Sequence, residues 1–193
     1  MQEKEIEIFH PTSYTAWWKW LEKNHLSKQA VWLVFYNKSS AKEAITWSEA
    51  VDAALCFGWI DSKKIKVDEE TAHQFFSKRK PTSTWSKINK IKVQELIGNG
   101  QMTDAGYKSV EIAKQNGSWT LLDEVEDLII PKDLETAFAS KPFAKDFFLS
   151  LSKSARKAIL QWLVLARRPE TRNKRIIEIV ELAGQKLKPT HLL

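Results

Sequence analysis

The stretch LCFGWID, residues 55–61, constrains the fold more than any other because two periodicities meet in it. Before it, apolar residues recur at helical spacing behind Thr46 and Glu49, which form the T-x-x-E capping box that starts a helix. After it, a strand is expected through residue 67, with lysines alternating outward. Gly58 stands between the two patterns, where a left-handed backbone lets a chain leave a helix. The stretch therefore predicts a helix-to-strand junction in a fold of mixed class.

Two further strands are predicted near this junction. Residues 30–36, AVWLVFY, are short, β-branched and aromatic, so we expect a strand with a buried face at the centre of a sheet. Residues 71–78 follow the acidic turn at 68–70 and should pair with the strand after Gly58 as an antiparallel hairpin. A helix over residues 12–24, capped by Thr12 or Ser13, precedes them. The expected sheet is small and antiparallel, with three or four strands.

Beyond residue 81 the patterns are helical. Helices are expected over residues 85–97, 103–116, 132–140, 142–149, 152–167 and 169–183. On the first of these, Ile88, Ile91 and Leu96 should face inward. The predicted fold class is therefore α+β, mainly helical, with a small antiparallel sheet and a C-terminal helical bundle.

Residues 117–132 are the candidate linker, because Gly117 and Pro131 bracket an acidic segment there. The predicted organisation is an α+β domain over residues 1–116, followed by a helical region over residues 133–193 packed on it. The alternative is one compact domain overall, which suits a chain of 193 residues.

The compartment is predicted from what the sequence lacks. A single cysteine excludes an intramolecular disulfide framework and a multi-cysteine metal site. The stretch MQEKEIEIFHPT has no basic region followed by an apolar run, and residues 30–36 are far shorter than the roughly 20 residues of a membrane helix. We therefore expect a cytoplasmic protein without membrane insertion.

The net charge of +6 is concentrated in two segments. Residues 61–92 carry nine Lys or Arg against four Asp or Glu, and residues 151–193 carry ten against three. The two segments could form one face for an anion, a nucleic acid or an acidic protein partner. The competing interpretation is ordinary solvated helix surface, which solubility also favours.

One candidate pocket combines the LCFGWID stretch with RKPTSTWSKIN, residues 79–89. Trp59 and Trp85 each stand at an element boundary beside cations and small polar groups, as in pockets for small ligands. Core packing is the competing interpretation for both indoles, and a turn or pairing role competes for Asp61. The candidate ligand-binding residues are Trp59, Asp61, Lys63, Arg79, Trp85 and Asn89.

A second candidate is an anion site at the helix corner ARRPETRNKR, residues 166–175. Arg167, Arg168 and Arg172 offer guanidinium groups for carboxylate or phosphate, and the helix that begins at Pro169 adds backbone donors. A solvated corner in which Glu170 pairs with Lys174 is the competing interpretation.

No catalytic signature is found. Cys56 lies near a predicted helix C-terminus among apolar residues, where a thiolate is disfavoured, so a small buried side chain is expected. The four histidines lack metal-ligand spacing, and no phosphate loop or nucleophile–base pair is seen. We therefore predict no catalytic residue, no metal and no cofactor. An enzyme whose site residues are dispersed in the sequence is the third class of function, behind the two given below.

Four motifs carry a resemblance to a known family. They are WLVFYNK, ITWSEAVDAALCFGWIDSKK, FFSKRKPTSTWSKINKIKVQELIGNGQMTDAGY and SLSKSARKAILQWLVLARRPETRNKRIIEIVELA, which together span nearly the whole chain. On these motifs the chain resembles the YdeI/OmpD-associated family of bacterial proteins, also labelled bacteriocin-protection proteins. The resemblance implies a role in tolerance of bacteriocins or cationic antimicrobial peptides, without a stated chemistry. The family has been described as periplasmic, whereas the residues predict the cytoplasm.

Two classes of function follow from these observations. The first is a non-enzymatic binding protein for a small anionic ligand or a peptide, with a protein partner also possible. The second is a nucleic-acid-binding protein that uses the basic segments and aromatic residues, although no helix-turn-helix, RNA-recognition or OB signature supports it.

Overall fold

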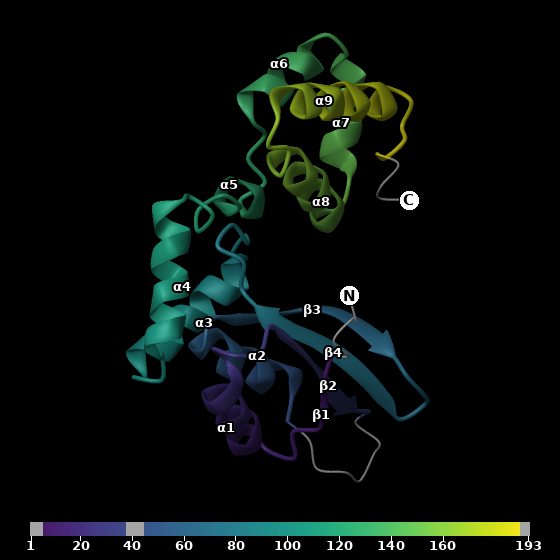
Figure 1. Cartoon of the computed structure of the whole chain (residues 1–193). Helices are drawn as coiled ribbons and strands as arrows, with labels where there is room; N and C mark the ends of the chain where they lie inside the picture. The colour runs from purple at the N-terminus through teal and green to yellow at the C-terminus, as the bar shows by residue number, and fades with distance from the viewer. Residues whose placement is uncertain (1–5, 38–44, 190–193) are drawn as a thin grey trace, which may run out of the picture. The chain divides into compact units, whose positions relative to one another are not determined.

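The computed structural model describes residues 6–37 and 45–189, so the last four residues of the expected C-terminal region lie outside it. The chain divides into two compact units (Figure 1). The first unit holds residues 1–83 and 88–119, and the second holds residues 84–87 and 120–193. The domain limits expected from the sequence stay a prediction, and each unit is described by itself.

The first unit contains a sheet with the strand order β1-β2-β4-β3. The strands are β1 (Ile8–Phe9), β2 (Ala30–Tyr36), β3 (Trp59–Lys66) and β4 (Thr71–Lys78). The predicted hairpin of β3 and β4 is confirmed, and β4 also pairs antiparallel with β2, which lies inside the sheet as expected.

The prediction of a purely antiparallel sheet is wrong, because β1 pairs parallel with β2. The backbone N–H of Trp32 donates to the carbonyl of Glu7 at 2.9 Å in this pairing. The helix α1 (Tyr14–Asn24) connects the two strands, and such a crossover returns the chain in the same direction. A strand of two residues carries too little alternation to be recognised in the sequence.

Four helices belong mainly to the first unit: α1, α2 (Trp47–Cys56), α3 (Lys87–Gly98) and α4 (Asp104–Gln115). Ser13 caps α1, and the capping box of Thr46 and Glu49 opens α2, as predicted. Trp17 of α1 contacts both the helix α2 and the strand β4. Its Nε1 donates to the carbonyl of Ala50 at 3.0 Å, and its ring meets Phe76 of β4 edge-on at 5.5 Å.

The inward face predicted for α3 is wrong for two of its three residues. Ile88 and Ile91 are 63% and 47% exposed, whereas Leu96 is buried as expected, together with Val93. Apolar residues lie on two sides of this helix, one with Ile88 and Ile91 and the other with Val93 and Leu96. The neighbouring elements pack against the side with Val93 and Leu96, and the sequence alone does not show this.

The second unit is helical, with Pro142 and Pro169 at the first turns of two of its helices. Its core gathers apolar side chains from all five helices, with Leu134, Phe138 and Leu160 among the most buried. The positions expected for the last four helices are confirmed to within a few residues. The helices are α5 (Asp123–Glu126), α6 (Lys132–Ala139), α7 (Pro142–Ser150), α8 (Lys153–Val164) and α9 (Pro169–Gly184). Within the described residues, no helix has the length and apolar character needed to cross a membrane.

The junction at Gly58 is confirmed, and α4 closes it. Gly58 has a φ of +69°, and its neighbour Cys56 ends α2. The carbonyl oxygen of Cys56 accepts from the Oγ1 of Thr103 at 2.6 Å and from its backbone N–H at 3.2 Å. A Cβ on Gly106 would lie 2.4 Å from that oxygen, so the backbones of α2 and α4 approach too closely for any side chain at this position.

We expect Gly106→Ala to lower the free energy of unfolding by about 1–3 kcal/mol, because the added methyl group must push α4 away from Cys56. Gly98→Ala is the matched control, since its Cβ would have no neighbour within 4 Å, and it should be neutral or raise stability by up to about 1 kcal/mol. Urea unfolding followed by circular dichroism measures both. Equal stabilities for the two variants would contradict the close approach.

Candidate functional site

The sheet of the first unit has one buried face and one face that is only half-buried. Burial alternates strictly along β2, and Val31, Leu33 and Phe35 point into the core. Phe76 and Gln74 of β4 are buried on the same side. Because side chains alternate along strands, the residues between them form the other face. We call this the open sheet face; it comprises Ile8, Ala30, Trp32, Val34, Tyr36, Ile60, Lys63, Ile65, Thr71, His73, Phe75 and Ser77.

An aromatic pair under a cation lies on the open sheet face. Trp32 and Phe75 are directly paired across β2 and β4, and their rings meet edge-on with centroids 4.9 Å apart. The Nζ of Lys63 lies 5.2 Å from the centroid of Trp32 and 5.7 Å from that of Phe75. His73 lies beside them, with its ring 6.4 Å from that of Trp32. The arrangement joins an apolar platform to one positive charge, which suits a planar or anionic ligand.

A β-bulge brings Lys63 to this face. Asp61 pairs with Phe76 and Lys64 pairs with Gln74, so three steps along β3 match two steps along β4. The extra residue reverses the alternation between Asp61 and Lys64. In a regular strand Lys63 would share the face of Asp61, and with the bulge it lies over the aromatic pair on the opposite face.

Asp61, one of the predicted ligand residues, has structural partners on the buried side. Its Oδ2 accepts from the Nε1 of Trp47 at 2.9 Å and from the Nε2 of Gln74 at 3.1 Å. Gln74 also donates to the carbonyl of Ser62 at 3.1 Å, inside the bulge. These contacts link α2, β3 and β4. They correspond to the pairing role that competed with ligand binding as the interpretation of Asp61 in the sequence.

Trp59 and Trp85 are both buried, as the core interpretation predicts. Trp59 meets Trp20 edge-on at 5.8 Å, and its Nε1 lies 3.4 Å from the carbonyl of His25. Trp85 belongs to the second unit. A pocket shared by the two indoles stays a prediction, and so does a ligand role for either of them.

Arg79 and Asn89 belong to the first unit. The backbone N–H of Arg79 donates to the carbonyl of Gly58 at 2.9 Å, directly at the junction. Burial lowers the pKa of Arg79 to about 10, and the negative charge of Asp61 offsets part of this effect. The guanidinium therefore stays protonated at neutral pH. Asn89 is half-buried in the first turn of α3.

In the second unit, Arg172 of the predicted anion site already binds a carboxylate. Its Nε and one terminal nitrogen donate to the two oxygens of Asp133 at 2.5 Å and 2.9 Å. These hydrogen bonds hold the pKa of Asp133 below its ordinary value. Arg167 and Arg168 are exposed at the start of α9. An anion site at this corner stays a prediction, with Arg172 engaged by the protein itself.

Cys56 is buried, as predicted. Burial raises the pKa of its thiol to about 12, and the nearby charge of Asp52 adds to the effect. Such a thiol is protonated at neutral pH and is therefore a poor nucleophile. Within residues 6–37 and 45–189, no group of three His, Cys, Asp or Glu side chains could hold a metal ion.

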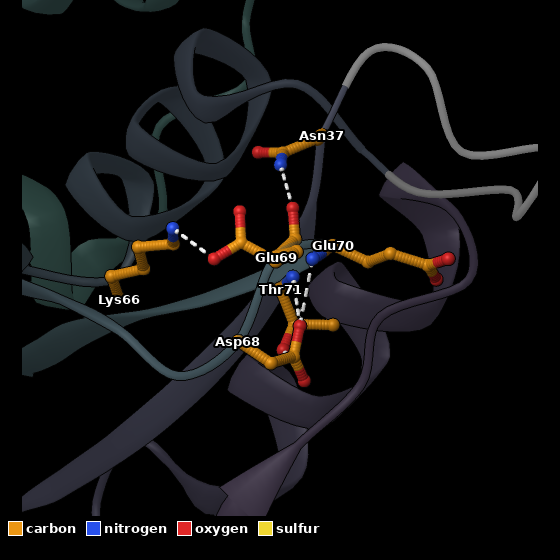
Figure 2. Close-up of polar contacts among 6 residues, drawn as sticks. All are labelled: Asn37, Lys66, Asp68, Glu69, Glu70 and Thr71. Carbon is orange, nitrogen blue, oxygen red and sulfur yellow. Dashed lines mark hydrogen bonds and ion pairs between the residues drawn. The ribbon is translucent and has the colours of Figure 1, made fainter.

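The loop between β3 and β4 is closed by its own acidic residues, as Figure 2 shows. The carboxylate of Asp68 accepts from the backbone N–H groups of Glu70 and Thr71 at 2.8 Å and 2.7 Å. Asn37 at the end of β2 donates to the carbonyl of Glu69, which pairs through its side chain with Lys66. The predicted acidic turn thus secures the hairpin and with it the pairing of Phe75 with Trp32.

Two comparisons with protein families match separate parts of the chain. Residues 9–109, more than half of the chain, match a family described as a domain of unknown function (DUF8412). The chain belongs to this DUF8412 family. Residues 127–186 match the family described as "Bacteriocin-protection, YdeI or OmpD-Associated", which confirms the resemblance predicted from the sequence. No curated protein and no solved structure matches the chain.

The four motifs that pointed to a single family in the sequence are divided between the two family matches. The DUF8412 match contains the first three motifs and all of the sheet except Ile8 of β1. The YdeI/OmpD-associated match begins at residue 127, in the second unit. The open sheet face therefore lies in the DUF8412 part of the chain, apart from the part that carries the bacteriocin-protection description.

The sequence pointed to Lys63 but missed Trp32, His73 and Phe75. Residues 30–36 are apolar throughout and residues 71–78 do not alternate regularly, so the sequence alone could not assign their aromatic side chains to a half-buried face. What the sequence did not contain was the register that sets Trp32 opposite Phe75, or the bulge that turns Lys63 toward them.

Stability should fall as the pH rises above about 9 because of Cys56. The unfolded thiol has its ordinary pKa near 8.5, whereas the folded thiol has a pKa of about 12. Between these values the unfolded chain has released a proton that the folded protein keeps, so alkali favours unfolding. The contribution is fully present below pH 8.5. Urea unfolding at pH 7.5, 9 and 10 should show a steeper loss for the wild type than for Cys56→Ala, and parallel slopes would contradict the buried, protonated thiol.

Proposed function

We propose that this protein binds a small anionic ligand, without catalysis, on the open sheet face of its first unit. We further propose that this binding contributes to tolerance of bacteriocins or cationic antimicrobial peptides. The first part is supported by the geometry around Lys63, and the second by the bacteriocin-protection description of the family matched by residues 127–186.

The single observation that carries the ligand class is the position of the Lys63 ammonium. It lies over two aromatic rings and has no carboxylate among the open sheet face residues, since these include no Asp or Glu. A cation over an exposed ring gains only about 0.5–1 kcal/mol. A charge-assisted hydrogen bond contributes about 1.5–3 kcal/mol, so an arriving anion offers Lys63 a stronger partner than the rings do.

The charge of the protein favours an anion over a cationic peptide as the direct ligand. A net charge of +6 repels a polycation at long range and attracts an anion. Tolerance of cationic peptides would then arise indirectly, through the anion that the protein binds, and not through capture of the peptide.

We place this activity in the cytoplasm, as the sequence predicted; detection in a membrane or periplasmic fraction would contradict that placement.

Nucleic acid is the second candidate, and the aromatic pair on the open sheet face favours it. Aromatic side chains on a sheet are platforms for the bases of single strands. A strand also needs a track of cations, because each phosphate contact contributes about 0.7 to the slope of log affinity against log salt. The open sheet face has one lysine, so a small anion fits it better than a strand does.

Lys63→Gln should weaken anion binding by roughly tenfold to a hundredfold, because the substitution removes one charged hydrogen bond. Isothermal titration with pyrophosphate, citrate, ribose 5-phosphate and adenosine monophosphate measures the affinities. Lys64→Gln is the matched control, since Lys64 is an exposed neighbour on the other face of β3 and its loss should change affinity by less than about threefold. Failure of every anion to bind the wild type would overturn the proposed function.

The link to tolerance is tested in cells. A bacterial strain that lacks this protein should regain growth in a cationic antimicrobial peptide when it expresses the wild type or Lys64→Gln, but not Lys63→Gln at the same protein level. Equal rescue by all three would separate anion binding from tolerance.

A further inference from the structure

We infer that the ligand of the open sheet face is a free nucleotide, whose base stacks on the Trp32–Phe75 pair and whose phosphate binds Lys63. This inference rests on the proposed function, because it names the chemical class of the small anion. It adds that the aromatic rings recognise part of the ligand and do more than support the lysine.

The ammonium of Lys63 marks where a base would lie. The Nζ of Lys63 lies 5.2 Å from the centroid of Trp32, so the ammonium group covers one face of that ring. Lys63 is an exposed side chain on a flexible stem, whereas Trp32 and Phe75 are half-buried on neighbouring strands. An incoming base would therefore displace the ammonium and leave the rings in place. The displaced ammonium would stay within reach of a phosphate attached to the same ligand.

Groups that can hydrogen-bond a base or ribose border the platform. His73 lies two residues from Phe75 on β4, on the same face, with its ring 6.4 Å from Trp32. The ring of Tyr36 extends the row on β2, and the ring of His10 packs edge-on against it with the centroids 4.9 Å apart. An imidazole can both donate and accept hydrogen bonds, and a nucleotide offers donors and acceptors on its base and ribose that a simple phosphate or dicarboxylate lacks.

The supply of cations limits the ligand to a single nucleotide. Lys66 pairs with Glu69 at 2.8 Å, and Lys78 donates to the carbonyl of Leu26 at 2.7 Å. Lys28, beside the start of β2, pairs with Glu7 at 3.2 Å. Of the residues that the pairing of the described strands places on the open sheet face, Lys63 alone is a lysine or arginine. One phosphate position beside one stacking platform matches a mononucleotide.

The test compares adenosine monophosphate with ribose 5-phosphate, which has the same phosphate and sugar but no base. Titration of the wild-type protein should give a dissociation constant roughly fivefold to a hundredfold lower for the nucleotide, the range that stacking of one base supplies. Trp32→Leu should remove this preference while leaving the affinity for ribose 5-phosphate within about twofold. Trp162→Leu is the matched control, because Trp162 is also a half-buried indole under a cation, Arg175, and its loss should leave the preference intact.

The possible outcomes separate this inference from the proposed function. Equal affinity for the two phosphates, or an unchanged preference in Trp32→Leu that is still folded by circular dichroism, would overturn the nucleotide while leaving anion binding in place. A ten-nucleotide single strand that binds more than tenfold tighter than the mononucleotide, with a salt slope well above 0.7, would also overturn it, in favour of nucleic acid. No binding of either phosphate or of the other anions would overturn both proposals.

Discussion

The first unit depends on the hydrogen bonds that the carbonyl oxygen of Cys56 accepts. This oxygen is the point where α2 ends, and it receives two hydrogen bonds from Thr103, so the end of one helix is capped by the beginning of another. Gly106 allows α4 to lie against it, and Gly58 then turns the chain into β3. The same few atoms thus terminate a helix, position a second helix and start a strand. A fold joined in this way tolerates little change of size at the junction, whatever the chemistry of the replacement.

Local signals predicted the elements that local chemistry specifies. The capping box at Thr46, the left-handed glycine at residue 58 and the acidic loop at residue 68 each act through neighbours a few residues away, so the sequence displays them directly. The parallel pairing of β1 and the face of α3 that is buried depend on parts of the chain far from those segments. The same limit applied to the candidate site, where the register and the bulge place Trp32, Phe75 and Lys63 together although they are spread over 44 residues.

The two units carry different kinds of information about function. The second unit bears the family description that suggests bacteriocin tolerance, and its exposed arginine corner is partly neutralised by the pairing of Arg172 with Asp133. The first unit bears a description without a function, and it holds the aromatic and cationic surface. A chemical role would then reside in one part of the chain and the phenotype attached to the family in the other, so studies of either part alone would give an incomplete account.

The bulge in β3 sets two residues, Ser62 and Lys63, opposite the single residue Phe75 of β4. Removing either Ser62 or Lys63 would restore regular alternation and leave one residue between Asp61 and Lys64, opposite Phe75 on the open sheet face. The cation would therefore stay beside the aromatic pair if Ser62 were removed and would be lost only with Lys63 itself. Substitutions at Ser62 would leave this phase unchanged. Among homologues, a gap of one residue at this point would therefore preserve the surface chemistry as long as the residue that remains before Lys64 is a cation.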